Sequence, residues 1–180
     1  MSRSATPPTN TEPNRIVSSN HLVSAKSPEL SEFEYGMIVA WHAFSRWMMR
    51  CMAATGYEDM TTIDVLVLHH VTHRDTAKRL ADICFVLNVE DTHVVSYSLK
   101  KLAGLKLVSS ARKGKEAFFS ATPEGRDACM RYRGLREACL MPGFSGNADE
   151  NEHLGELARM LRTLSGRYDQ AARAASTSSL

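Results

Sequence analysis

Hydrophobic positions between residues 78 and 102 follow a helical period twice, with a short polar break between the two runs. The first run places apolar side chains at i, i+3, i+4 and i+7, which is the spacing of one buried helix face: Leu80, Ile83, Cys84 and Leu87. This spacing predicts a helix over residues 78–87. Asn88 ends that helix, and we expect it to cap a second helix, with Asp91 completing a capping box, that extends to about Leu102.

The second helix separates into an apolar face and a hydrogen-bonding face. Val95, Leu99 and Leu102 stand at i, i+4 and i+7 and are expected to pack inward. The opposite stripe carries only hydrogen-bonding side chains: His93, Ser96, Tyr97 and Lys100. Donors and acceptors read base edges in the major groove, so this stripe suits a DNA-reading helix. A solvated helix face has the same polarity, so the helix alone leaves both interpretations open.

A basic hairpin follows. Residues 107–111 and 117–121 are strand-like runs on either side of a turn that contains Gly114. Between Tyr97 and Lys115 the chain carries six basic residues and no acidic one: Lys100, Lys101, Lys106, Arg112, Lys113 and Lys115. Such a block beside a groove-reading helix favours contact with the phosphates of DNA.

The predicted DNA contacts divide by chemistry. Uncharged polar groups suit base edges, whereas cations suit phosphate. The predicted DNA-binding residues are Thr92, His93, Ser96, Tyr97, Lys100, Lys101, Arg112, Lys113 and Lys115.

The hairpin leads into Thr122-Pro123-Glu124-Gly125, a helix start with Thr as cap and Pro at the first helical position. The order helix, polar helix, basic hairpin and this helix start resembles the MarR family of bacterial winged-helix transcription regulators, over about residues 28–172. The resemblance implies a mainly helical α+β winged helix whose terminal helices form a dimerisation base. Segments 30–34 and 90–93 are similar to an LdtR-like branch of that family in proteobacteria.

The wing departs from the family pattern. Many members carry an Asp-x-Arg element there, whereas this chain has Lys113-Gly114-Lys115. The resemblance therefore implies neither the wing's internal salt bridge nor its minor-groove arginine. Arg112 is a candidate substitute for the latter.

The expected organisation is one MarR-like domain with two short tails. Residues 1–27 are rich in Ser, Thr, Pro and Asn and are predicted to be disordered, as is the tail 175–180. Within the domain at 28–174, we assign 28–56 and 123–174 to the dimerisation helices and 60–122 to the winged helix-turn-helix lobe.

The terminal helices predict a partner chain. A helix from Glu29 to about Ala54 is apolar on most sides, and a last helix over about 149–174 repeats an apolar stripe with Leu154, Leu157 and Leu161. A chain of 180 residues cannot cover all of that surface itself. We expect a homodimer, whose two-fold symmetry predicts a pseudo-palindromic operator. An intramolecular helical cap is the alternative.

A further helix begins at Thr61, where Thr61 and Asp64 have capping-box spacing, and joins the dimerisation base to the lobe. The family resemblance implies that a small ligand, often aromatic or anionic, binds between those parts. The predicted ligand-binding residues are Trp41, His42, Phe44, Arg46, Met49, Leu66 and His69. Arg46 is the natural anion partner, although ordinary core packing explains the same aromatic and Met residues.

Other chemistries are less well supported. His69 and His73 stand at i, i+4, but no third metal ligand is spaced nearby. Cys51 lies in an apolar stripe, which raises a thiol pKa and favours an inert core residue over a sensor. Four cysteines without a C-x-x-C pair indicate buried free thiols: Cys51, Cys84, Cys129 and Cys139. No catalytic or phosphate-loop motif indicates an enzyme, and no cofactor is expected.

Composition restricts the function further. The net charge is only +2, so affinity for polyanions has to come from the local basic block. The sequence has no signal-peptide pattern and no run long enough to span a membrane, which predicts a cytoplasmic protein. These features together predict a homodimeric, ligand-responsive regulator that binds double-stranded DNA. A winged helix used only for protein contacts, and a thiol- or metal-responsive sensor, are the alternatives.

Overall fold

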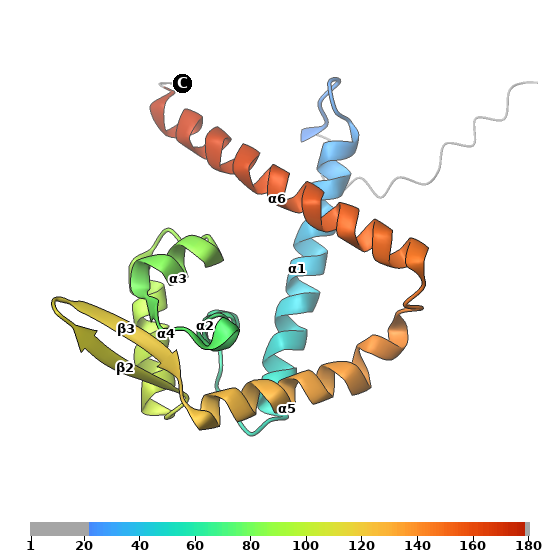
Figure 1. Cartoon of the computed structure of the whole chain (residues 1–180). Coiled ribbons are helices and arrows are strands. Elements are labelled where there is room, and N and C mark those ends of the chain that lie inside the picture. Colours follow the sequence, from blue (N-terminus) through green and yellow to red (C-terminus); the bar gives the residue numbers. More distant parts are fainter. Residues whose placement is uncertain (1–21, 179–180) are drawn as a thin grey trace, which may run out of the picture. The chain divides into compact units, whose positions relative to one another are not determined.

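The computed structural model describes residues 22–178 and contains two compact units, which meet in the sequence between Arg126 and Asp127. The first unit contains α1 (Glu29–Ala53), α2 (Thr62–Thr72), the 3-10 turn η2 (His73–Asp75), β1 (Lys78–Arg79), α3 (Leu80–Leu87), α4 (Thr92–Gly104), β2 (Val108–Lys113) and β3 (Glu116–Ala121) (Figure 1). Helix α5 (Pro123–Cys139) begins in the first unit and continues into the second, which also holds η3 (Met141–Gly143) and α6 (Ala148–Thr177). The predicted fold class, a mainly helical α+β winged helix, is confirmed.

A small antiparallel sheet stands beside the helix-turn-helix. Its strand order is β1-β3-β2, with Lys78 opposite Phe119 and Val108 opposite Ala121. The prediction that Lys78 and Arg79 are helical was wrong, because these two residues pair with β3 as a short strand. As the first residues of a helix, Lys78 and Arg79 would have amides without a partner inside that helix. Pairing with β3 gives their backbone groups partners instead.

The core of this lobe lies where α2, α3 and α4 meet. Helix α2 contacts α1 on one side and α3 and α4 on the other. Its side chains Val65, Val67, Leu68 and Val71 are buried, as are Ile83 of α3 and the inner face of α4. Burial on so many sides explains why α2 is apolar with little amphipathic pattern.

Helix α2 starts as its sequence predicts. The Thr61 hydroxyl accepts the Asp64 amide at 3.3 Å, and the Asp64 carboxylate accepts the Thr61 amide at 2.9 Å. This reciprocal capping box pairs two amides that the first helical turn leaves without partners.

The turn between α3 and α4 differs from the prediction. Asn88 does not cap α4: it ends α3 in the left-handed conformation, with φ 52°. The Val89 amide then donates to the Cys84 carbonyl at 2.9 Å, which closes the end of α3. Asp91 caps α4 instead, accepting the His93 amide at 2.9 Å. The sequence signal failed because Asn suits both helix caps, and only the backbone conformation decides between them.

The start of α5 is held against the segment that follows α4. The Thr122 amide donates to the Leu107 carbonyl at 3.0 Å, and the Thr122 hydroxyl donates to the Lys106 carbonyl at 2.7 Å. The same hydroxyl accepts the Gly125 amide at 3.0 Å, which confirms Thr122 as the helix cap. A Cβ on Gly125 would lie 2.1 Å from the Leu107 carbonyl oxygen, so only glycine fits this contact.

Helix α6 is long and has no buried residue. The Asn147 side chain caps it by accepting the Glu150 amide at 2.8 Å. The helix continues to Thr177, so the prediction of a disordered tail from 175 was wrong for residues 175–177. Of the N-terminal tail, 1–21 lie outside the described residues, and within 22–27 Ser24 and Ser27 form a bridge. Across residues 22–178, no helix combines the length and apolarity that membrane crossing requires.

Candidate nucleic-acid interface

Helix α4 presents the two faces that its spacing predicts. Val95, Leu99 and Leu102 are buried, so the inner face is committed to the core of the lobe. On the outer face, Tyr97 is 73% exposed, and His93 and Lys100 are exposed as well. Ser96 is half-buried and Thr92, at the start of the helix, is exposed. The outer face therefore offers hydrogen-bonding groups to a partner along the length of the helix.

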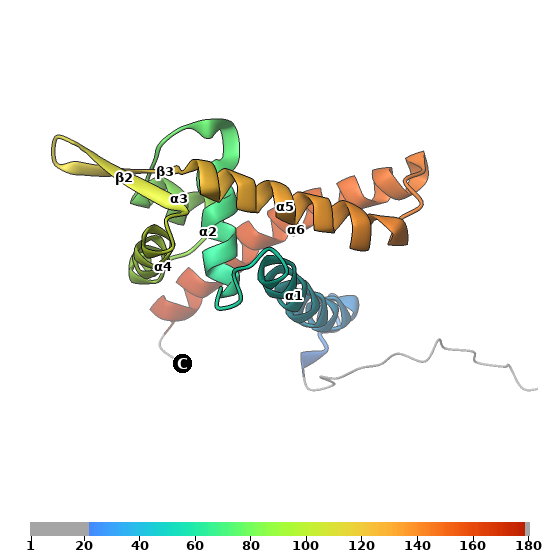
Figure 2. The same ribbon diagram turned by 90° about the horizontal axis from the view of Figure 1, so that it is seen from below.

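The wing is a β-hairpin that extends from the lobe as an arm (Figure 2). Strands β2 and β3 pair from Val108 opposite Ala121 to Lys113 opposite Glu116, leaving Gly114 and Lys115 as the turn. Gly114 has φ 66°, which glycine adopts without steric cost. The strands are longer than predicted, so Arg112 and Lys113 lie at the end of β2. Both are exposed, as is Lys115, so the wing tip is cationic.

An ion-pair cluster not predicted from the sequence links the base of α3 to the wing. The Arg79 guanidinium forms two hydrogen bonds of 2.9 Å with the Asp82 carboxylate and lies 3.6 Å from Glu116. The hydrogen bond from Arg79 lowers the pKa of Asp82, and the Asp82 carboxylate raises the pKa of Arg79. The Arg79–Glu116 ion pair therefore joins the residue before α3 to the first residue of β3. Arg79 and Asp82 are three positions apart, whereas the pairing of β1 with β3, which was not predicted, brings Glu116 near Arg79.

Lys101 is not placed like the other predicted DNA-binding cations. Its ammonium lies 2.8 Å from the Asp64 carboxylate and also donates to the Asp59 carbonyl. Asp64 is buried, and the Lys101 side chain is 26% exposed. The Lys101 ammonium therefore differs from the other predicted cations in that it is paired with a carboxylate of the lobe.

The residues predicted to hold a ligand are divided between exposed and half-buried positions. On α1, Trp41, His42, Phe44 and Arg46 are exposed, with the rings of Trp41 and Phe44 6.5 Å apart between centroids. Met49 of α1 is half-buried, as are Leu66 and His69 of α2, and burial lowers the pKa of His69. The exposed members leave an aromatic and cationic surface on α1.

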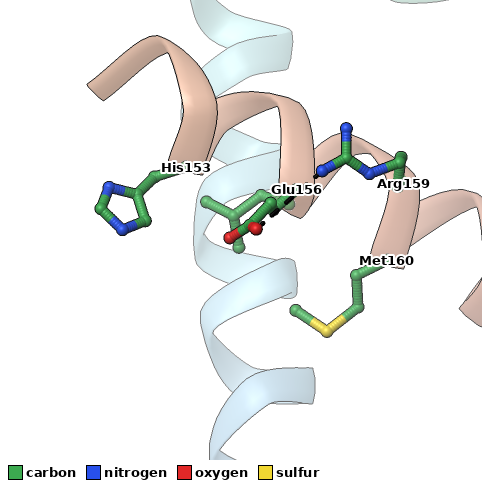
Figure 3. Close-up of a pocket in the computed structure, with 5 residues that line it drawn as sticks. His153, Glu156, Arg159 and Met160 are labelled. Atoms are coloured by element: carbon green, nitrogen blue, oxygen red, sulfur yellow. Dashed lines mark ion pairs between the residues drawn. The ribbon is translucent and has the colours of Figure 1, made fainter. Parts of the chain in front are cut away.

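A hollow of about 540 Å³ lies on α6, and its lining includes none of the predicted ligand-binding residues (Figure 3). It is lined by His153, Glu156, Leu157, Arg159 and Met160. The Arg159 Nη2 atom lies 4.0 Å from Oε1 of Glu156. All of these residues come from one helix, so the hollow is part of an exposed helix surface.

The described residues bring together no group of three or more His, Cys, Asp or Glu side chains that could hold a metal ion. His73 lies in the 3-10 turn after α2, outside the helix that carries His69. Cys51, Cys84 and Cys129 are buried free thiols as predicted, whereas Cys139 is exposed. Burial raises the pKa of Cys84, which disfavours the reactive thiolate.

Part of the chain matches a known protein family. Residues 60–125 match the family described as winged helix DNA-binding domain. No curated protein matches the chain. The matched segment begins at α2 and ends at the start of α5, so it contains the whole helix-turn-helix and the wing.

Solved structures extend the similarity to most of the chain. A MarR-family regulator from Silicibacter pomeroyi is 20% identical, with 78% of this chain and 94% of that chain covered and a TM-score of 0.60. A mutant MarR from E. coli complexed with operator DNA is 17% identical, with coverage of 77% and 99% and a TM-score of 0.61. CouR from Rhodococcus jostii RHA1 bound to p-coumaroyl-CoA is 14% identical, with coverage of 73% and 90% and a TM-score of 0.61.

Residues 60–125 are therefore similar to winged helix DNA-binding domains. The chain as a whole has the fold of MarR-family transcriptional regulators. Its placement in the LdtR-like branch stays a prediction.

Proposed function

We propose that this protein is a sequence-specific regulator of transcription that binds double-stranded DNA. The observation that carries the proposal is the exposed hydrogen-bonding face of α4 beside the cationic wing tip, within one winged helix domain. Helix α4 is the candidate for the major groove, with Ser96 and Tyr97 toward base edges. Lys100, Arg112, Lys113 and Lys115 are the candidates for phosphate contacts.

The proposal includes a homodimer. Helix α6 leaves Leu154, Leu157, Met160 and Leu161 between 43% and 47% exposed, and α1 leaves Ile38, Val39, Trp41 and Phe44 about half exposed. Apolar side chains exposed together on one helix face are typical of a surface that a partner covers. A second copy of the chain is the proposed cover. Two-fold symmetry then calls for a pseudo-palindromic operator, whose half-sites are separated by whole turns of DNA.

A small aromatic or anionic ligand is the proposed effector. The surface on α1 offers the Trp41 and Phe44 rings for stacking and the Arg46 guanidinium for a carboxylate or phosphate. CouR, which has the same fold, was solved with an aromatic acyl-CoA bound. Such a ligand would change DNA affinity only if it binds the DNA-competent and DNA-incompetent states unequally.

Selection of DNA by the purified full-length protein tests the proposal. Fragments of its own genome are incubated with the protein at physiological salt, and the retained fragments are sequenced. We expect a small set sharing an inverted repeat. A Ser96→Ala, Tyr97→Ala double variant is the matched control, and it should retain DNA without enriching that repeat. Retention of random fragments by both proteins would contradict sequence-specific reading.

One observation favours a second candidate, a winged helix that binds a protein. Phe85 is 85% exposed on α3 and Val86 is 59% exposed beside it. A phenylalanine so exposed in a DNA-reading lobe is typical of a contact surface. In this alternative Phe85→Ser abolishes capture of the partner and the protein enriches no DNA sequence.

A further inference from the structure

A partly buried ion pair joins the start of α2 to the C-terminal half of α4. Asp64 is 2% exposed, and its carboxylate lies 2.8 Å from the Lys101 ammonium. The same carboxylate oxygen accepts the Thr61 amide at 2.9 Å and the Thr61 hydroxyl at 2.8 Å. The Asp64 carboxylate therefore caps the start of α2 and also binds the Lys101 ammonium of α4.

Lys101 makes a second contact with the loop before α2. Its ammonium donates to the backbone carbonyl of Asp59, two residues ahead of the Thr61 cap. Asp64 and Asp59 thus hold one ammonium from two points, and both lie outside α4. These two directional contacts, added to the apolar packing, restrain α4 in rotation about its axis and in sliding along α2.

The surroundings favour the ionised pair. Burial alone would raise the pKa of Asp64, but Lys101, the Thr61 backbone and the hydroxyls of Ser98 and Thr61 together lower it. The carboxylate is therefore charged near neutral pH. Removing one partner of a buried pair leaves the other uncompensated, so such a pair favours one arrangement of the two helices strongly.

Neighbouring lysines on α4 have opposite surroundings. Lys100 is exposed on the face with Tyr97, whereas Lys101 points into the lobe. Both were expected from the sequence to contact phosphate. The two lysines are adjacent in the sequence, but one is exposed and the other is paired with Asp64, so each serves as a control for the other.

We infer that Asp64 and Lys101 are positioning residues that fix the orientation of α4 for base reading, and that Lys101 makes no phosphate contact. The inference rests on the proposed function, because it concerns how the DNA-reading helix is held. A helix misoriented by a small angle loses base-edge hydrogen bonds, while flexible lysines still reach phosphates. Loss of the pair should therefore reduce sequence preference more than general DNA affinity.

The test compares Lys101→Met with Lys100→Met in the full-length protein. Binding to the duplex enriched by the wild type and to a scrambled duplex of equal length is measured across a salt series. We expect Lys101→Met to weaken binding to the enriched duplex roughly tenfold or more, with the salt slope unchanged. Lys100→Met should lower the slope by about one for both duplexes.

Two results would overturn the inference. A fall in slope of about one for Lys101→Met, with parallel loss on both duplexes, would make Lys101 a phosphate contact. Unchanged binding to both duplexes would mean that the pair does not orient α4.

Two further variants guard against a simple folding defect. Lys101→Arg keeps a donor for Asp64 and should restore most of the preference for the enriched duplex. Asp64→Asn removes the carboxylate of the ion pair and leaves Lys101 in place. The salt slope should then be unchanged, or steeper if the unpaired Lys101 ammonium reaches a phosphate. Melting curves establish that each variant is folded at the temperature of the binding assay.

Failure of the proposed function would be recognised separately. If the wild type enriches no duplex, amide hydrogen exchange over residues 92–104 replaces the binding assay. Lys101→Met should then exchange faster than Lys101→Arg in this helix, whereas equal exchange would overturn the positioning role.

Discussion

The lobe at residues 60–122 and helix α6 were expected to be parts of one domain, yet they are stabilised in different ways. In the lobe, inner faces of α2, α3 and α4 are buried, and the capping box of α2, strand pairing and the Asp64–Lys101 pair provide polar contacts. In α6, thirty residues form a helix with none buried. Helices in water owe most of their stability to packing of an apolar face. The difference supports the proposed homodimer, in which a second copy of the chain covers the apolar stripe of α6.

The largest effect should come from α6. Replacing Leu157 and Leu161 by Asp places charges on its apolar stripe and should convert the proposed dimer to monomers. Operator affinity should then fall on the order of a hundredfold or more, because two half-sites no longer add. Gln170→Asp, on the opposite side of α6, is the control. Sedimentation and duplex binding check both outcomes, and a dimeric double variant would place the interface elsewhere.

A smaller loss should follow from overpacking at the start of α5. Gly125→Ala forces a Cβ against the Leu107 carbonyl and should destabilise the protein by about 1–3 kcal/mol. Gly134 lies in the same helix with open space around it, so Gly134→Ala should be neutral or stabilise by up to about 1 kcal/mol. Denaturant unfolding compares the two. Equal effects would show that the close approach at Gly125 does not exist in solution.

The outer face of α4 should separate specificity from affinity. Ser96→Ala or Tyr97→Ala should cost about 1–3 kcal/mol on the operator and leave binding to scrambled duplex nearly unchanged. Lys100→Ala should weaken both. Titration of each variant with the two duplexes measures this. Equal losses on both duplexes for Ser96→Ala and Tyr97→Ala would remove this face from the base-reading surface.

The wing should contribute affinity without sequence preference. Lys113→Ala with Lys115→Ala should weaken binding to all duplexes about equally, and each lost contact should reduce the salt slope by about one. The contribution of the exposed Arg79–Glu116 ion pair is expected to be small, because exposed ion pairs contribute little. A double variant with wild-type affinity and slope would mean that the wing does not touch DNA.

The smallest effect concerns pH and is confined to the lobe. Burial lowers the pKa of His69, so the unfolded chain binds a proton there before the folded chain does. Stability should therefore fall as the pH drops below about 6.5, the ordinary histidine value. His69→Gln should make the fall shallower, leaving the contribution of His70, whose pKa is also lowered chiefly by burial. Thermal melts across that range test it, and an unchanged pH dependence would contradict the assignment.

Periodicity along the chain predicted most of the lobe. The spacing of Val95, Leu99 and Leu102 predicted which face of α4 is buried, and Thr61 with Asp64 predicted the start of α2. Local signals sufficed there because a helix face and a capping box are set by residues a few positions apart. The separate strand β1 was missed, since its partner in β3 lies about forty residues away in the sequence.

The candidate site was less accessible to sequence reasoning. Lys100 and Lys101 look equivalent in a list of basic residues, and only the packing of α4 on α2 sends one outward and the other to Asp64. The Arg79–Glu116 ion pair depends in the same way on strand pairing. Charge patterning therefore identified the cationic surface but not which cations remain available to DNA.

The salt dependence of wild-type binding to its enriched duplex is the most direct test of DNA reading by this protein. Neutralised phosphates release counterions, so the logarithm of the binding constant should fall linearly with the logarithm of salt concentration. With four candidate phosphate-contacting cations in each of two subunits, we expect a slope steeper than about −4. A flat response, or no preference over scrambled duplex at any salt concentration, would contradict DNA reading and favour the protein-binding alternative.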